Sequence, residues 1–144
     1  MSREKKMNQR GISVESISRI ERKIPQNDSV LTFFDNLEFF LPRIQRVFFL
    51  KSSSKSIKRG GHAHKQCNQF LISIKGEIEI FIKDREGGTV DIKLNSMDNC
   101  FIPAGLWIDI IMSSDSILMV LCDAQYSEDD YIRQWKNYIL DERR

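Results

Sequence analysis

Short runs of β-branched, aromatic and aliphatic residues recur about every ten residues through the second half of the chain. These runs occupy residues 69–74, 77–82, 89–94, 100–102, 107–112 and 116–122. Glycine, proline or polar residues separate them, as is typical of turns. The series predicts an all-β sandwich or barrel. We expect the first two runs, which flank Lys75-Gly76, to form a hairpin.

The first third of the chain is less regular. Residues 31–34 and 44–50 are apolar enough to predict two further strands, whereas 12–24 fits either a short helix or parts of a strand. Residues 1–10 are polar and basic without periodicity, so we expect a mobile tail. The remainder, 11–144, is expected to form one domain.

The end of the chain has a different pattern from the rest. Ser127 is followed by three acidic residues, which resembles the start of a helix. Apolar residues then recur at helical spacing, at Tyr131, Ile132, Trp135, Tyr138 and Ile139. The pattern predicts a terminal helix that packs on the β core.

Charge and cysteine content limit the functional classes. A net charge of +2 is too small to indicate a nucleic-acid-binding protein, although a local cluster of arginines can still hold a small anion. Cys67, Cys100 and Cys122 lie in or beside apolar runs without Cys-x-x-Cys spacing, which favours buried, reduced thiols and a cytoplasmic location. No apolar run approaches the roughly 20 residues that span a bilayer, so no membrane partner is expected.

The only two histidines lie one residue apart, in the segment Arg59-Gly60-Gly61-His62-Ala63-His64-Lys65. On a strand, His62 and His64 point to the same face and can converge on one ligand, metal or proton. The preceding glycines allow backbone to approach a ligand closely, and Arg59 and Lys65 add positive charge. A surface pair or a structural pair is the alternative interpretation, and the context favours a functional site.

This segment resembles the first motif of the cupins, in which two histidines precede an acid and a glycine. The corresponding residues are His62, His64, Gln69 and Gly76, and the second cupin motif resembles Pro103 to Ile108. Metal-binding cupins carry an acid and a histidine where this chain has Gln69 and Ile108. An amide is a poor ligand and isoleucine is none, so we expect neither a metal nor another cofactor.

A narrower resemblance follows from the whole histidine segment together with Gln69. It is similar to that of the cupin sugar 3,4-ketoisomerases, the WxcM-like family, which act on dTDP-4-keto-6-deoxyglucose. The resemblance covers about residues 28–140, including the tail from Tyr126 to Arg133. It implies an all-β cupin double-stranded β-helix, a jelly-roll barrel, with a C-terminal α-helix. It also implies a cytoplasmic homodimer that makes unusual deoxysugars for surface polysaccharide.

The resemblance also implies roles for individual residues. The reaction moves a proton from C3 to C4 of the sugar through an enediol or enediolate, and one imidazole can serve both steps. His64 is the favoured base, with His62 orienting the sugar or stabilising the enediolate, and the reverse assignment is the alternative. The expected substrate-binding residues are Arg59, Lys65, Gln69, Arg46, Trp107 and Asp109.

Three pairs of residues depart from the family pattern. Phe48-Phe49 replaces two tyrosines, Ile108-Asp109 replaces His-Glu, and Asp28-Ser29 replaces Arg-Gly. These replacements remove polar groups, which is why a binding module that keeps the nucleotide-sugar pocket without chemistry is a second hypothesis. A metal-dependent cupin enzyme is the third.

Overall fold

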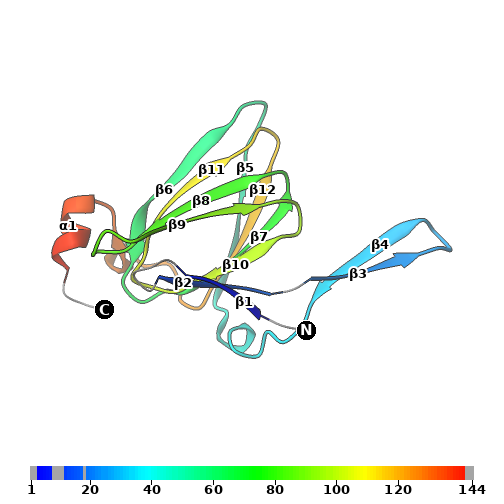
Figure 1. Cartoon of the computed structure of the whole chain (residues 1–144), viewed down its shortest axis with the longest axis horizontal. Helices are drawn as coiled ribbons and strands as arrows, with labels where there is room; N and C mark the ends of the chain where they lie inside the picture. Colours follow the sequence, from blue (N-terminus) through cyan, green and yellow to red (C-terminus); the bar gives the residue numbers. More distant parts are fainter. Residues whose placement is uncertain (1–2, 8–11, 18, 142–144) are drawn as a thin grey trace.

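The computed structural model describes residues 3–7, 12–17 and 19–141, and this part of the chain is dominated by antiparallel β-sheet (Figure 1). One sheet has the strand order β1 (Arg3–Met7), β2 (Ser13–Ile17), β10 (Asn99–Ile102), β7 (Gln69–Lys75), β12 (Ile117–Cys122) and β5 (Arg46–Lys51). The facing sheet has the order β13 (Tyr131–Ile132), β6 (Ile57–His64), β11 (Trp107–Met112), β8 (Ile78–Lys83) and β9 (Thr89–Leu94). A separate hairpin of β3 (Arg19–Ile24) and β4 (Ser29–Phe34) projects from this barrel.

The core lies between the two sheets because alternate residues of each strand face inward. On β8, Ile78, Ile80 and Ile82 are fully buried while the intervening Glu79 is exposed. From the opposite sheet, Leu118 belongs to the same cluster of buried residues. Burying one such aliphatic side chain contributes roughly 1.5–3 kcal/mol, so the alternation fixes which face of each strand is internal.

A second apolar cluster covers the outer face of the first sheet. Phe40, which precedes a short 3₁₀ helix (Leu41–Arg43), is buried and meets Phe101 edge to face at 5.1 Å between ring centroids. Phe39 also meets Phe101, at 5.4 Å, and Phe70 belongs to the same cluster. This cluster is separate from the one that fills the space between the two sheets.

The all-β architecture with a C-terminal helix is confirmed, and so are the strands expected after residue 30. The undecided segment 12–24 forms β2 and β3. One expected pairing is wrong, because β7 pairs with β10 and β12 whereas β8 pairs with β9 and β11. Gly76, at φ +82°, therefore turns the chain from one sheet into the other.

Two expectations at the ends of the chain need correction. Arg3–Met7, expected within the mobile tail, forms β1 and pairs with β2, while the other residues of 1–10 lie outside the described part. The terminal helix is shorter than expected: a 3₁₀ turn spans Glu128–Asp130, and α1 spans only Trp135–Leu140. Between them Tyr131–Ile132 forms β13, because its backbone pairs with β6.

All three cysteines are buried and unpaired by disulfides, as expected. Within the described ranges, no helix is both long and apolar enough to cross a membrane.

Candidate active site

A β-bulge interrupts the strand that carries both histidines. The register between β6 and β11 shifts between Ile108 and Asp109, and the extra residue is taken up at Gly60 and Gly61, whose φ angles are +90° and +75°. A Cβ on Gly60 would lie 2.7 Å from the Ile108 carbonyl oxygen. The glycines are therefore required by backbone geometry and by a close approach of the two strands.

The bulge determines which side chains share the inner face of β6. Across the strand pair, His62 lies opposite Ile108 and Arg59 lies opposite Ile110. Directly opposed residues of antiparallel strands point to the same face. Arg59 and His62 therefore face the interior together although three positions separate them, and His64 follows on the same face.

Arg59 and His62 on this inner face line a pocket of about 430 Å³ between the two sheets, and the buried His64 adjoins this pocket behind Tyr131, which also lines it. Strands β5, β6, β7, β11 and β12 form its wall together with the segment after the second 3₁₀ turn. Aliphatic residues make up much of the lining. The polar groups are Lys58, Arg59, His62, Gln69, Tyr131 and Arg133. A mainly apolar pocket with a few polar groups is typical of small-ligand sites.

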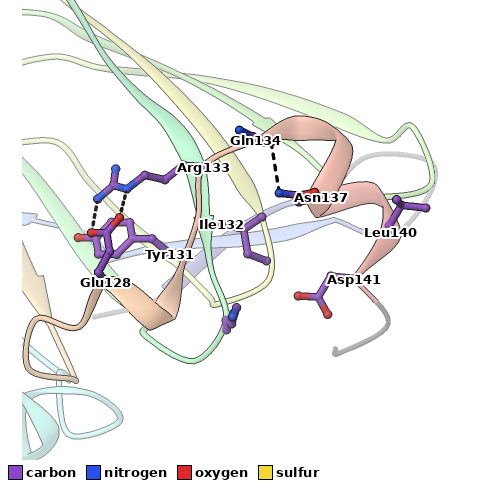
Figure 2. Close-up of a pocket in the computed structure, with 9 residues that line it drawn as sticks. Glu128, Tyr131, Ile132, Arg133, Gln134, Asn137, Leu140 and Asp141 are labelled. Carbon is purple, nitrogen blue, oxygen red and sulfur yellow. Dashed lines mark hydrogen bonds and ion pairs between the residues drawn. The ribbon is translucent and has the colours of Figure 1, made fainter.

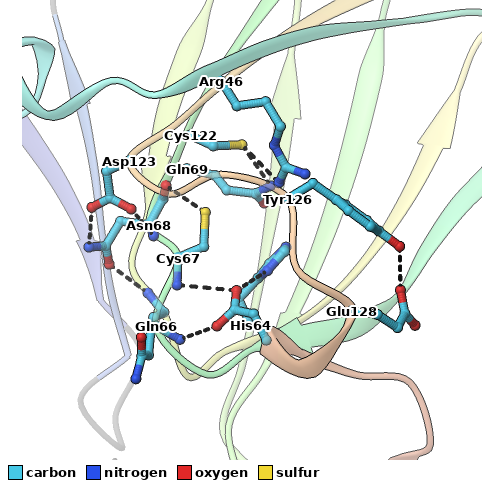
Figure 3. Close-up of polar contacts among 12 residues, drawn as sticks. Arg46, His64, Gln66, Cys67, Asn68, Gln69, Cys122, Asp123, Tyr126 and Glu128 are labelled. Carbon is cyan, nitrogen blue, oxygen red and sulfur yellow. Dashed lines mark hydrogen bonds and ion pairs between the residues drawn. The ribbon is translucent and has the colours of Figure 1, made fainter.

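The imidazole of His64 is hydrogen-bonded to the carboxylate of Asp130. Its Nδ1 lies 2.8 Å from Asp130 Oδ2, and the histidine is only 4% exposed. The backbone N–H groups of Gln66 and Cys67 donate to the same carboxylate, at 2.7 and 3.4 Å (Figure 3). Because Asp130 accepts from Nδ1–H, the free lone pair is on Nε2, which is buried without a hydrogen-bond partner in the described residues.

Both imidazoles are electrically neutral near pH 7. Burial lowers the pKa of His62 to about 4, and the proximity of His64 and of the Arg133 guanidinium acts in the same direction. Burial also lowers the pKa of His64, although the hydrogen bond to Asp130 opposes this effect. The two rings meet edge to face at 5.1 Å between centroids, so neutral nitrogens of both lie close together.

Tyr131 closes the pocket over the histidines. Its ring centroid lies 4.3 Å from that of His64 and 5.0 Å from that of His62, and the Arg133 guanidinium lies 4.2 Å from it on the ring face. Arg133 is held by Glu128, whose Oε2 accepts from Nη2 at 3.0 Å. A cation over an aromatic face is attracted to it, so this pair keeps Tyr131 in place.

The expected substrate-binding residues are divided among different places. Arg59 and Gln69 line the histidine pocket. Arg46 lies next to it, with its guanidinium over the ring of Phe48, which lines the pocket. Lys65 instead lines a separate open cleft of about 750 Å³ beside α1, with Gln134 and Asn137 (Figure 2).

Trp107 and Asp109, which are expected to bind substrate, do not line the histidine pocket. Ile108 and Ile110 of β11 line the pocket, so the residues that alternate with them point to the outer face. There Trp107 packs in a buried cluster with Tyr138, and its Nε1 donates to Asp109 Oδ2 at 3.3 Å. The aromatic residue therefore packs against the terminal helix.

Sequence reasoning missed Asp130, Tyr131 and Arg133 as site residues. The family resemblance includes the tail from Tyr126 to Arg133, but the apolar spacing there predicts a helix, so these three side chains are not expected at the site. The pairing of β13 with β6, which is long-range, brings Tyr131 directly opposite His64.

One group of side chains has the composition of a metal site. His64, Cys67 and Asp130 each offer a ligand atom within 4.8 Å of the others. However, Nδ1 of His64 and the Cys67 N–H already donate to the Asp130 carboxylate. Hydrogen bonding therefore accounts for the arrangement, and the absence of a metal stays a prediction.

Comparison with known proteins places this site in a family. The family model described as "FdtA: WxcM-like, C-terminal" matches residues 12–143. This chain belongs to that family. It is 33% identical, over 66% of its length and 69% of the relative's, to the TDP-4-oxo-6-deoxy-alpha-D-glucose-3,4-oxoisomerase of Aneurinibacillus thermoaerophilus.

Solved structures agree with the family and with the cupin-type fold. The sugar 3,4-ketoisomerase QdtA of Thermoanaerobacterium thermosaccharolyticum, in complex with TDP, has a TM-score of 0.72 and 28% identity. The match covers 88% of this chain and 91% of that one. The TDP-fucose-3,4-ketoisomerase WlaRA of Campylobacter jejuni has a TM-score of 0.71 and 26% identity, over 88% and 91% of the two chains.

Proposed function

We propose that this protein is a 3,4-ketoisomerase of a dTDP-linked 4-keto-6-deoxy sugar. The observation that carries the proposal is the pair of His64 and Asp130 in a member of this family. The pair leaves Nε2 of His64 buried and without a hydrogen-bond partner among the described residues. The named relatives support the substrate class, because QdtA binds TDP and a variant of it was solved with TDP-4-keto-6-deoxyglucose.

The reaction requires proton transfer between adjacent carbons. Nε2 of His64 removes the proton from C3, and the electrons of that bond form the C3–C4 double bond of an enediolate while O4 gains negative charge. The imidazolium then returns a proton to C4. The proton of the C3 hydroxyl passes to O4, which leaves the carbonyl at C3. The reaction has no net electron change, so it requires no redox cofactor.

Residues around His64 fit supporting roles. Neutral His62 orients the sugar or hydrogen-bonds the enediolate, and Arg59 and Arg133 supply positive charge for the diphosphate or the developing oxyanion. Asp130 keeps Nδ1 of His64 protonated, so that Nε2 remains the base.

NMR of the protein with dTDP-4-keto-6-deoxyglucose in D₂O tests this proposal. We expect deuterium at C3 or C4, a new 3-keto sugar, and a loss of about 10²-fold or more in the His64→Asn variant. An unchanged rate in that variant would exclude His64 as the base. If the wild-type protein binds dTDP in calorimetry but exchanges no deuterium with any dTDP-4-keto sugar, the protein is a binding module.

The assembly and the cellular role are also proposed. The β5 edge exposes Val47 and Phe49, and the projecting β3–β4 hairpin exposes Val30 and Leu31, so we infer a homodimer that covers apolar surface of this kind. A monomeric mass by light scattering at micromolar concentration would contradict it. The three free thiols support a reducing cytoplasm, and the product is expected to supply deoxysugars for surface polysaccharide.

A further inference from the structure

Arg46 is a partly buried cation without a carboxylate partner. Its Nε is buried and has no hydrogen-bond partner among the described residues, and none of the ion pairs formed there includes it. The rings of Phe48 and Tyr126 lie 5.4 and 5.6 Å from its guanidinium carbon. Aromatic faces offset only part of the cost of burying a charge, so another counter-charge is expected.

The sulfur of Cys122 occupies the position of that counter-charge. On β12, Cys122 lies directly opposite Arg46 of β5 and opposite Gln69 of β7. Arg46 Nη2 and Gln69 Nε2 each donate to its Sγ at 3.5 Å (Figure 3). The thiol of Cys67 instead donates to the Asn68 carbonyl oxygen at 3.4 Å. Donors from both flanking strands thus meet at one fully buried sulfur.

We propose that Cys122 is a thiolate in the folded protein and that it pairs with Arg46, fixing the guanidinium beside the histidine pocket. A neutral thiol needs an acceptor for its own proton, whereas a thiolate accepts from all of these donors. Cys67 keeps its proton, which it donates to the Asn68 carbonyl oxygen. In agreement, the neighbouring Cys67 thiol and the donors Gln69 and Arg46 lower the pKa of Cys122 against the effect of burial.

The pair has a consequence for the reaction, and this part rests on the proposed function. The charge of Arg46 lowers the pKa of His64, as does that of Arg133, while Asp130 raises it. A thiolate next to Arg46 offsets part of the guanidinium's effect. Cys122, which is fully buried, is therefore a positioning residue that acts on the base through Arg46.

Ultraviolet absorbance of thiolate against pH tests the ion pair without any substrate. We expect one thiol of the wild-type protein to ionise about one pH unit or more below the ordinary thiol pKa of about 8.5. Cys122→Ser should lose this step and Arg46→Met should move it to higher pH. Cys100→Ser is the matched control and should keep the step, because Cys100 is buried elsewhere and burial raises its pKa to about 12. Absence of a low step in the wild-type protein, or its persistence in Cys122→Ser, would overturn the proposal.

Kinetics then test the positioning role. Cys122→Ser should move the acid limb of kcat/KM to lower pH, and Cys122→Asp, which restores an anion, should return it toward the wild-type position. An unchanged profile in Cys122→Ser would refute the positioning role even if the thiolate is present. If the wild-type protein proves inactive, the proposed function fails, whereas the absorbance titration still decides whether the ion pair exists.

Discussion

His64 Nδ1 and Asp130 Oδ2 lie 2.8 Å apart although 66 positions separate the two residues in the sequence. The contact depends on β13, which places Tyr131 opposite His64 and Ile132 opposite Ala63. The Lys65 N–H also donates to the Asp130 carbonyl oxygen at 2.8 Å. Backbone pairing therefore positions the carboxylate, and the orientation of the imidazole follows from it.

Replacing Asp130 with asparagine should lower kcat by about 10²-fold or more, because the amide no longer fixes the tautomer or stabilises the imidazolium. Since Asp130 raises the pKa of His64, its loss should also move the acid limb of the kcat profile to lower pH. Steady-state kinetics across pH measure both effects. Asp129→Asn is the matched control, because Asp129 is the exposed neighbour. Retention of activity within about twofold in Asp130→Asn would contradict this role for the carboxylate.

The strand pattern was predictable because burial alternates along a strand whatever its partner. Ile78, Ile80 and Ile82 showed which residues are internal. They did not show which strand β8 would pair with, since a glycine at position 76 suits a tight hairpin as well as a turn between sheets. For this reason the hairpin expected between residues 69–74 and 77–82 is wrong.

The site was only partly predictable, for a related reason. His62 and His64 are close in sequence, so their shared face followed from strand periodicity. Arg59 lies on the same face only because of the bulge. Trp107 and Asp109 do not line the pocket because they alternate along β11 with Ile108 and Ile110, which do. Asp130 comes from a distant segment in which the apolar spacing predicts a helix. The chain forms β13 there instead, because its backbone pairs with β6.

The buried histidines should make the protein less stable in acid. His62 has a pKa of about 4 when folded and about 6.5 when unfolded, so only the unfolded state takes up protons between these values. The contribution of His62 to the free energy of unfolding is therefore constant above about pH 6.5 and falls as the pH decreases toward about 4. From about pH 7 to pH 5 we expect His62 to contribute about 1–2 kcal/mol of the loss.

Urea unfolding of the wild-type protein and of His62→Gln at both pH values measures this contribution. Carboxylates titrate equally in the two proteins, so the difference isolates the imidazole. Identical pH dependence in the two proteins would show that His62 is not held neutral by burial.

Gly60→Ala should destabilise the fold more than Gly105→Ala. Both glycines have a φ of +90°, so both substitutions carry the same backbone strain. The new Cβ at Gly60 would also lie 2.7 Å from the Ile108 carbonyl oxygen, whereas that at Gly105 meets nothing within 4 Å. We expect an extra loss of about 2 kcal/mol for Gly60→Ala in urea unfolding. Equal losses would mean that the bulge relaxes without cost.

Phe48→Tyr should increase activity, whereas Phe49→Tyr should not change it. The two positions alternate on β5, so Phe48 lines the histidine pocket while Phe49 points outward and is 59% exposed. A phenol at position 48 adds a hydrogen-bond donor to a pocket in which negative charge develops on the enediolate, and one such donor can contribute tenfold or more in rate. We expect kcat for dTDP-4-keto-6-deoxyglucose to rise about tenfold in Phe48→Tyr. An equal response of the two variants, or a decrease in Phe48→Tyr, would indicate that the enediolate oxygen lies away from β5 and relies on the donors of β6 and of the segment around Tyr131.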